Sequence, residues 1–198
     1  LERLTLSGIG EPLHNHAVTT RFVEWARKQN LKSSLTTSGG PLPKLRTWLE
    51  TVPHNGITLS VHAGTEAVRK QLVPHGPALE PLFGLLESVL PTLTRKRRKK
   101  VALAYLMMEG VSAEDSELDA FAARAVPLGV AVHLFAYNPV RTSSQKPVSR
   151  ARYEAAYERL RAQGLVVRMS SAARLEANGG CGTLVALSPP PRSAEQTP

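Results

Sequence analysis

Residues 4–12, Leu-Thr-Leu-Ser-Gly-Ile-Gly-Glu-Pro, form a short strand pattern that runs directly into a glycine-rich turn carrying a carboxylate. The segments 31–39, 56–62 and 130–139 follow the same plan: each is a short strand pattern that ends in small or polar residues. Amphipathic stretches with apolar residues at helical spacing lie between them. Strands that alternate with helices pair in parallel, because each helix returns the chain to the same edge of the sheet. The sequence therefore predicts an α/β fold.

The alternation continues through most of the chain, and two architectures fit it. A doubly wound open sheet and a partial (β/α) barrel both place functional residues at the carboxyl ends of the strands. Ser112 is the expected N-cap of one helix, and Gly164 is expected to end another. The expected strands are residues 4–7, 31–37, 56–62, 101–107, 130–135 and 165–169, and the expected helices are residues 17–29, 42–49, 65–72, 79–93, 112–126 and 149–163.

The composition of the 198 residues, 42% hydrophobic and 5% aromatic, suits an α/β protein with an aliphatic core. No apolar run approaches the roughly 18 residues of a membrane span. The net charge of +9 favours polyanionic partners such as RNA, although many basic proteins are only arginine-rich. Cys181 is the single cysteine, which excludes an internal disulfide and favours a reducing cytoplasm. The first residue is not Met and the first strand begins almost at once, so we expect a truncated chain.

Each polar strand end has an ordinary explanation when taken alone. Gly10 lets a backbone approach a ligand closely, and Glu11 can accept hydrogen bonds from an ammonium group, but a tight turn explains both. The segments 36–39, 60–62 and 138–139 are equally typical of strand-to-turn junctions. Cys181 lies between glycines, where a thiol is either accessible and reactive or a small inert side chain.

Taken together, the motifs resemble one family, the RlmN/Cfr radical S-adenosylmethionine (SAM) methyltransferases, which methylate carbon 2 or carbon 8 of adenine in RNA. The resemblance covers residues 1–187 and depends on the order of the motifs. They are Gly-x-Gly-Glu-Pro-Leu-x-Asn (8–15), Thr-Ser-Gly (37–39), Ser-Val-His (60–62), a basic run (95–100), Tyr-Asn-Pro (137–139) and Gly-Cys-Gly-x-Leu (180–184).

The resemblance implies a partial (β/α)6 TIM-like barrel that lacks its first strand and the Cys-x3-Cys-x2-Cys loop of the 4Fe-4S cluster. Residues 1–187 would supply the second to the sixth β/α units and a methyl-carrier loop, and residues 188–198 a disordered Pro/Ser-rich tail. Cys181 would be the catalytic methyl carrier. The implied SAM-binding residues are Gly10, Glu11, Thr36 (where the family usually has Ser), Ser60, Val61, His62 and Asn138.

The implied activity is methylation of an adenine carbon in ribosomal or transfer RNA, by a cytoplasmic monomer that needs an electron donor for its cluster. That carbon is not nucleophilic, so a radical derived from SAM must form the bond, and the cofactor supplies this chemistry. One cysteine cannot ligate the cluster, so the isolated chain is expected to be inactive and to hold no metal of its own. The alternatives are a non-catalytic RNA- or SAM-binding remnant of the family, or an unrelated (β/α) enzyme with a phosphate-bearing substrate.

The chain also departs from the family pattern. Gly64-Thr65-Glu66 replaces the usual Pro-Asn-Asp, residues 170–175 lack the usual Gly and Asp before the carrier cysteine, and Gly-Gly-Cys-Gly-Thr (179–183) replaces Ala-Ala-Cys-Gly-Gln. These changes leave the RNA site open. The basic run 95–100 is either an RNA-phosphate contact or a solvated loop.

Overall fold

The computed structural model describes residues 2–7, 10–139 and 143–170. Six parallel strands form one sheet, and they are arranged in the order in which they occur along the chain. The strands are β1 (Arg3–Leu6), β2 (Lys32–Thr37), β3 (Gly56–Ser60), β4 (Val101–Met107), β5 (Ala131–Ala136) and β6 (Val167–Met169). A doubly wound sheet reverses its strand order at a switch point, whereas a barrel adds each strand beside the last. The sequential order therefore identifies the partial barrel. The short β6 pairs with β5 and corresponds to the strand expected at residues 165–169, so all six expected strands are present.

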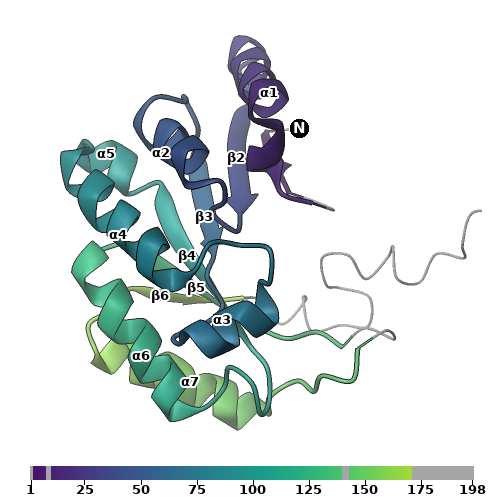
Figure 1. The fold of residues 1–198 in the computed structure, drawn as a ribbon, viewed down its shortest axis with the longest axis vertical. Coiled ribbons are helices and arrows are strands. Elements are labelled where there is room, and N and C mark those ends of the chain that lie inside the picture. Colours follow the sequence, from purple (N-terminus) through teal and green to yellow (C-terminus); the bar gives the residue numbers. More distant parts are fainter. Residues whose placement is uncertain (1, 8–9, 140–142, 171–198) are drawn as a thin grey trace, which may run out of the picture.

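The register gives the two faces of the sheet different chemistry. Side chains alternate across a strand, and the outward set is aliphatic and buried: Leu35, Ile57, Leu59, Leu103, Val132 and Leu134. The helices α1 (His16–Lys28), α2 (Leu42–Glu50), α4 (Leu79–Val89), α6 (Asp115–Ala125) and α7 (Arg150–Ala162) lie along the outer side of the curved sheet (Figure 1). Their apolar stripes and the strands share one core. At about 1.5–3 kcal/mol per buried aliphatic side chain, this core is the main stabilising contribution.

The inward face consists mostly of small and polar side chains. Thr36 pairs with Thr58 across β2 and β3, Ser60 pairs with Ala104 across β3 and β4, and Ala104 pairs with His133 across β4 and β5. Such a face has little apolar surface to bury. It is suited to lining a concave polar site, as the inside of a partial barrel must.

Ser112 does not begin α6, contrary to expectation. Glu114 is the N-cap residue, and Ser112 is buried in the turn before it. Its hydroxyl donates to the Leu106 carbonyl (2.7 Å) and accepts from the Met108 amide (3.1 Å). A serine hydroxyl can satisfy a turn as well as a helix start, and here the turn uses it.

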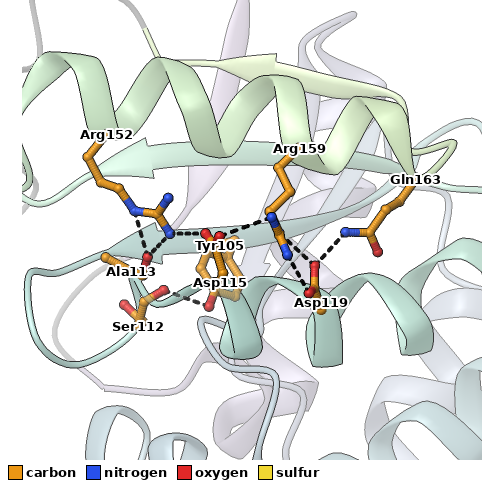
Figure 2. Close-up of polar contacts among 8 residues, drawn as sticks. All are labelled: Tyr105, Ser112, Ala113, Asp115, Asp119, Arg152, Arg159 and Gln163. Carbon is orange, nitrogen blue, oxygen red and sulfur yellow. Dashed lines mark hydrogen bonds and ion pairs between the residues drawn. The ribbon is translucent and has the colours of Figure 1, made fainter.

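A row of charged hydrogen bonds joins α6 to α7 (Figure 2). Two guanidinium nitrogens of Arg159 donate to the Asp119 carboxylate, at 2.7 and 2.6 Å. Arg152 donates to Asp115 (2.6 Å) and to the Ala113 carbonyl. Figure 2 shows both guanidinium groups reaching from α7 to the start and middle of α6. The pairs are half-exposed, so they orient the helices more than they stabilise them.

Short helical segments complete the described part. They are η1 (Pro12–Asn15), α3 (Glu66–Leu72), η2 (Leu90–Thr92), α5 (Arg95–Arg98) and η3 (Val126–Leu128). Within the described ranges, no helix combines the length and the apolar character that crossing a membrane requires.

Candidate functional site at the carboxyl edge of the sheet

Glu11 joins the loop after β1 to the end of β2. Its carboxylate accepts four hydrogen bonds, two on each oxygen. Oε1 accepts from the Leu13 amide (3.1 Å) and the Thr37 hydroxyl (2.5 Å), and Oε2 accepts from the Ser38 amide (2.7 Å) and hydroxyl (2.5 Å). Two of these donors are hydroxyls, which can rotate. A ligand ammonium group can therefore take their place without moving the backbone.

Gly10 precedes this carboxylate with φ +103°, a conformation that side chains rarely adopt. A Cβ built at this position has nothing within 4 Å, so the backbone conformation, and not crowding, requires glycine. Gly10 therefore sets the direction in which Glu11 enters η1, and Glu11 is the N-cap residue of that segment.

The end of β3 is held by backbone contacts to β4. The amides of Val61 and His62 both donate to the Ala104 carbonyl at 3.1 Å, and His62 has φ +60°. Burial, and then the positive charge of Arg69, lower the pKa of His62 to about 4, while the Ala104 backbone acts in the opposite direction. His62 is therefore a neutral imidazole at pH 7, and its Nδ1 is buried without a hydrogen-bond partner within the described residues.

Arg69 connects the ends of β2 and β3, a role that no sequence motif indicated. The side chain is 1% exposed, and its guanidinium donates to the carbonyls of Ser38 (2.7 Å), Ser60 (2.6 Å) and Val61 (2.9 Å). On the sequence, Arg69 is simply one basic residue on the polar side of a short helix. Only the fold reveals that this side chain turns inward.

Glu117 fixes the turn after β3, and this contact explains a departure from the family pattern. The buried carboxylate accepts from the Gly64 amide (2.7 Å) and from the Thr65 amide (3.2 Å) and hydroxyl. A Cβ on Gly64 would lie 2.1 Å from the Glu117 carbonyl oxygen. The usual proline has no room here, because α6 packs directly against the turn.

The other predicted site residues occupy three different situations. Thr36 lies on the inward face of β2, one residue before the hydroxyl that contacts Glu11. Asn138 follows β5, on the same edge of the sheet because all the strands are parallel. Cys181 lies outside the described residues. The structure thus joins Glu11, Ser60 and Val61 in one network through Ser38 and Arg69, and places Thr36, His62 and Asn138 along the same edge.

The basic run lies at the opposite edge. α5 directly precedes β4, so it is at the amino end of the sheet. Arg97 donates to the carbonyls of Trp48 (3.0 Å), Leu49 (2.5 Å) and Val52 (2.7 Å), and Lys100 donates to the carbonyl of His54 (2.8 Å). These two cations serve the fold.

The cluster and SAM place different demands on the chain. A 4Fe-4S cluster needs three cysteine thiolates and the sequence holds one, so the residues present do not fit it. The described ranges also contain no group of three or more His, Cys, Asp or Glu arranged to hold a metal ion. The donor set of the carboxyl edge does fit SAM: it offers a carboxylate, hydroxyls and a neutral imidazole for a ligand with ammonium and purine groups.

A sequential parallel sheet with its polar loops on one edge defines a partial (β/α) barrel, the architecture of radical SAM proteins. A radical SAM methyltransferase from Sphaerobacter thermophilus superposes with a TM-score of 0.81 at 22% identity, over 92% of this chain and 55% of that one. A domain of pyruvate-formate lyase-activating enzyme from Bacteroides vulgatus gives a TM-score of 0.70 at 13% identity, over 86% of this chain and all of that one. These likenesses show a shared fold.

Sequence comparison identifies the kind of methyltransferase that the chain resembles. The chain is 24% identical to a probable dual-specificity RNA methyltransferase RlmN from Opitutus terrae, over 92% of this chain and 50% of the relative. It is 26% identical to the dual-specificity RNA methyltransferase RlmN of Sorangium cellulosum, over 97% and 50%. No protein-family model matches. The chain is thus similar to RlmN-type RNA methyltransferases along nearly its whole length, and it spans about half the length of these curated relatives.

Proposed function

We propose that the chain forms the SAM-binding barrel of an RNA methyltransferase that methylates an adenine carbon through an S-methylcysteine carrier. The observation that carries the proposal is the polar network at the carboxyl edge, in which Glu11, Ser38 and the Ser60–Val61 strand end are joined by hydrogen bonds. Its relatives supply the reaction class. The RNA is ribosomal or transfer RNA, and an electron donor, a cytoplasmic location and a monomeric state belong to the same proposal.

Each residue of the edge has a defined task in SAM binding. Glu11 accepts hydrogen bonds from the ammonium group, while Gly10 leaves room for the ligand beside the backbone. Thr36, Ser60 and Asn138 offer hydrogen-bonding groups along the ligand, beside the Val61 backbone. His62 is neutral at pH 7, so it adds no positive charge beside a cationic sulfonium. When bound, SAM supplies the methyl group and the radical chemistry. Cys181, outside the described residues, is the proposed methyl carrier.

The test is SAM binding by the full chain, measured by equilibrium dialysis with methyl-labelled SAM. Glu11→Gln keeps the size of the side chain but removes its charge, and a charged hydrogen bond contributes about 1.5–3 kcal/mol. We therefore expect affinity to fall by roughly tenfold or more. Glu24→Gln is the matched control, since Glu24 is an exposed residue of α1, and this variant should bind SAM as the wild type does. A wild-type chain that binds no SAM, or a Glu11→Gln chain that binds equally well, would contradict the proposal.

A second function, a non-catalytic SAM- or RNA-binding remnant, is favoured by the single cysteine of the chain. The two candidates differ at Cys181. Incubation with methyl-labelled SAM, an electron donor and the cluster-bearing portion of a relative should label Cys181 if it is a methyl carrier. Binding without any label on Cys181, and with no effect of Cys181→Ala, would favour the remnant.

A further inference from the structure

Arg69 is a buried cation at the carboxyl edge, and SAM binding as proposed above gives it no role. It lies on α3, 1% exposed, beneath the loops that follow β2 and β3. Besides its three contacts to the strand ends, its Nε donates to the Pro77 carbonyl at 3.0 Å. Within the described residues, all four hydrogen-bond partners of the guanidinium are backbone carbonyls.

This set of partners is unusual for a buried charge. Buried cations are normally paired with a carboxylate, because taking an unpaired charge out of water is costly. Burial lowers the pKa of Arg69 to about 10, against the opposing effects of Glu66 and Glu11, so the group remains charged at neutral pH. Its fork of donors is used to collect carbonyls at the ends of two strands, where the regular ladder stops.

Ser38 links this cation to the candidate ligand-binding carboxylate. Its amide donates to Glu11 (2.7 Å), and its carbonyl accepts from Arg69 (2.7 Å). Ser38 therefore stands between an anion and a cation. Each of its two hydrogen bonds polarises the adjacent peptide group in the direction that strengthens the other bond. The ends of β2 and β3 and the loop after β1 are thereby held as one unit.

We propose that Arg69 is a positioning residue, which fixes the Ser38 and Ser60–Val61 strand ends in the geometry that binds SAM. The inference rests on the proposed function for the identity of the ligand. Ser60 and Val61 are candidate SAM contacts, and Arg69 holds the carbonyls of both. Its effect on the ligand is therefore indirect, through the backbone.

Gly76 provides a second way to disturb the guanidinium. A Cβ at this position would lie 2.8 Å from Arg69 Nη2 and 2.7 Å from Val73 Cγ1. The added methyl group of Gly76→Ala should therefore displace the Arg69 guanidinium while the arginine itself is kept. Arg69→Lys keeps the charge but loses the planar fork, so it can serve only some of the four carbonyls.

The experiment uses the full chain with three variants, Arg69→Lys, Arg69→Met and Gly76→Ala, and one control. Lys70→Met is the control, since it removes a positive charge from the neighbouring, exposed position of the same helix. Three quantities are measured: the melting temperature, the amide chemical shifts without ligand, and the dissociation constant for labelled SAM. We expect Arg69→Lys and Gly76→Ala to stay folded, with the largest shift changes at Ser38 and residues 60–62. We expect their SAM affinity to fall roughly tenfold, as for loss of one charged hydrogen bond.

Lysine should rescue binding in part, so that affinity decreases from wild type to Arg69→Lys to Arg69→Met, while Lys70→Met matches the wild type. If Arg69→Met does not fold, the lysine and Gly76→Ala variants decide the matter. The proposal is overturned if the folded variants lose thermal stability but bind SAM as the wild type does. A wild-type chain that binds no SAM removes the proposed function and the ligand with it, whereas the amide shifts still report whether Arg69 holds the strand ends.

Discussion

His54 and His62 are both held neutral by their surroundings. Burial, together with the positive charges of Arg97 and Lys100, lowers the pKa of His54 to about 3. Its ring is 1% exposed, and neither nitrogen has a hydrogen-bond partner within the described residues. Protonating either histidine would place a charge beside an existing cation, so the fold is built around the neutral forms.

This state has a consequence for pH dependence, and the sign follows from the direction of the shifts. Both folded pKa values lie below the unfolded value of 6.5, so the unfolded chain binds more protons as pH falls. The free energy of unfolding should be greatest above pH 6.5 and fall toward pH 4, by up to about 1.4 kcal/mol per pH unit for each histidine.

Urea unfolding of wild type and His54→Leu at pH 7.5, 6.5 and 5.5 checks this, in a window above the range where most carboxylates titrate. The variant should lose less stability across the window, because one of the two neutral histidines is gone. Equal losses for the two proteins would show that His54 does not carry the effect.

Among the elements, α5 acts as a cap for α2. The last carbonyls of a helix lack partners within it, and Arg97 reaches across from α5 to donate to those of Trp48 and Leu49, and to Val52 beyond. A basic run was an ambiguous signal, since phosphate contact and solvation both fit it. The contacts show that two members of the run, Arg97 and Lys100, are structural.

Arg97→Met should therefore destabilise the fold by about 1–3 kcal/mol, because it leaves carbonyls at the end of α2 without donors. Arg95→Met is the matched control, since Arg95 is exposed in the same helix, and it should change the melting temperature little. Thermal unfolding of the two variants measures the difference. Equal melting temperatures would mean that the cap contributes nothing.

Element boundaries were predictable where local chemistry sets them. The pattern predicted a helix over 17–29, and α1 covers His16–Lys28; Ser149 was predicted to open a helix, and it caps α7. Ser112 looked like the same signal and was wrong, because a buried turn had a greater need for its hydroxyl. The burial of the Arg69 side chain and the hydrogen bonds from residues 64–65 to Glu117 depend on contacts between distant segments. No local sequence pattern therefore predicts them.

At the scale of the whole molecule, the two edges of the sheet carry different kinds of residue. The carboxyl edge carries Glu11, the Ser60–His62 strand end and Asn138, while the amino edge carries the basic run. The parallel order predicted from the alternation of strands and helices was enough to place the candidate site residues on one edge. It did not reveal how they are joined, since that depends on Ser38 and Arg69.

The central claim is that SAM binds at the carboxyl edge, and amide hydrogen exchange of the full chain with and without saturating SAM tests it most directly. We expect slower exchange at residues 10–13, 36–39 and 60–65, and no change at residues 95–100 on the opposite edge. Protection confined to the amino edge, or absent from all three segments while SAM is bound, would contradict the account.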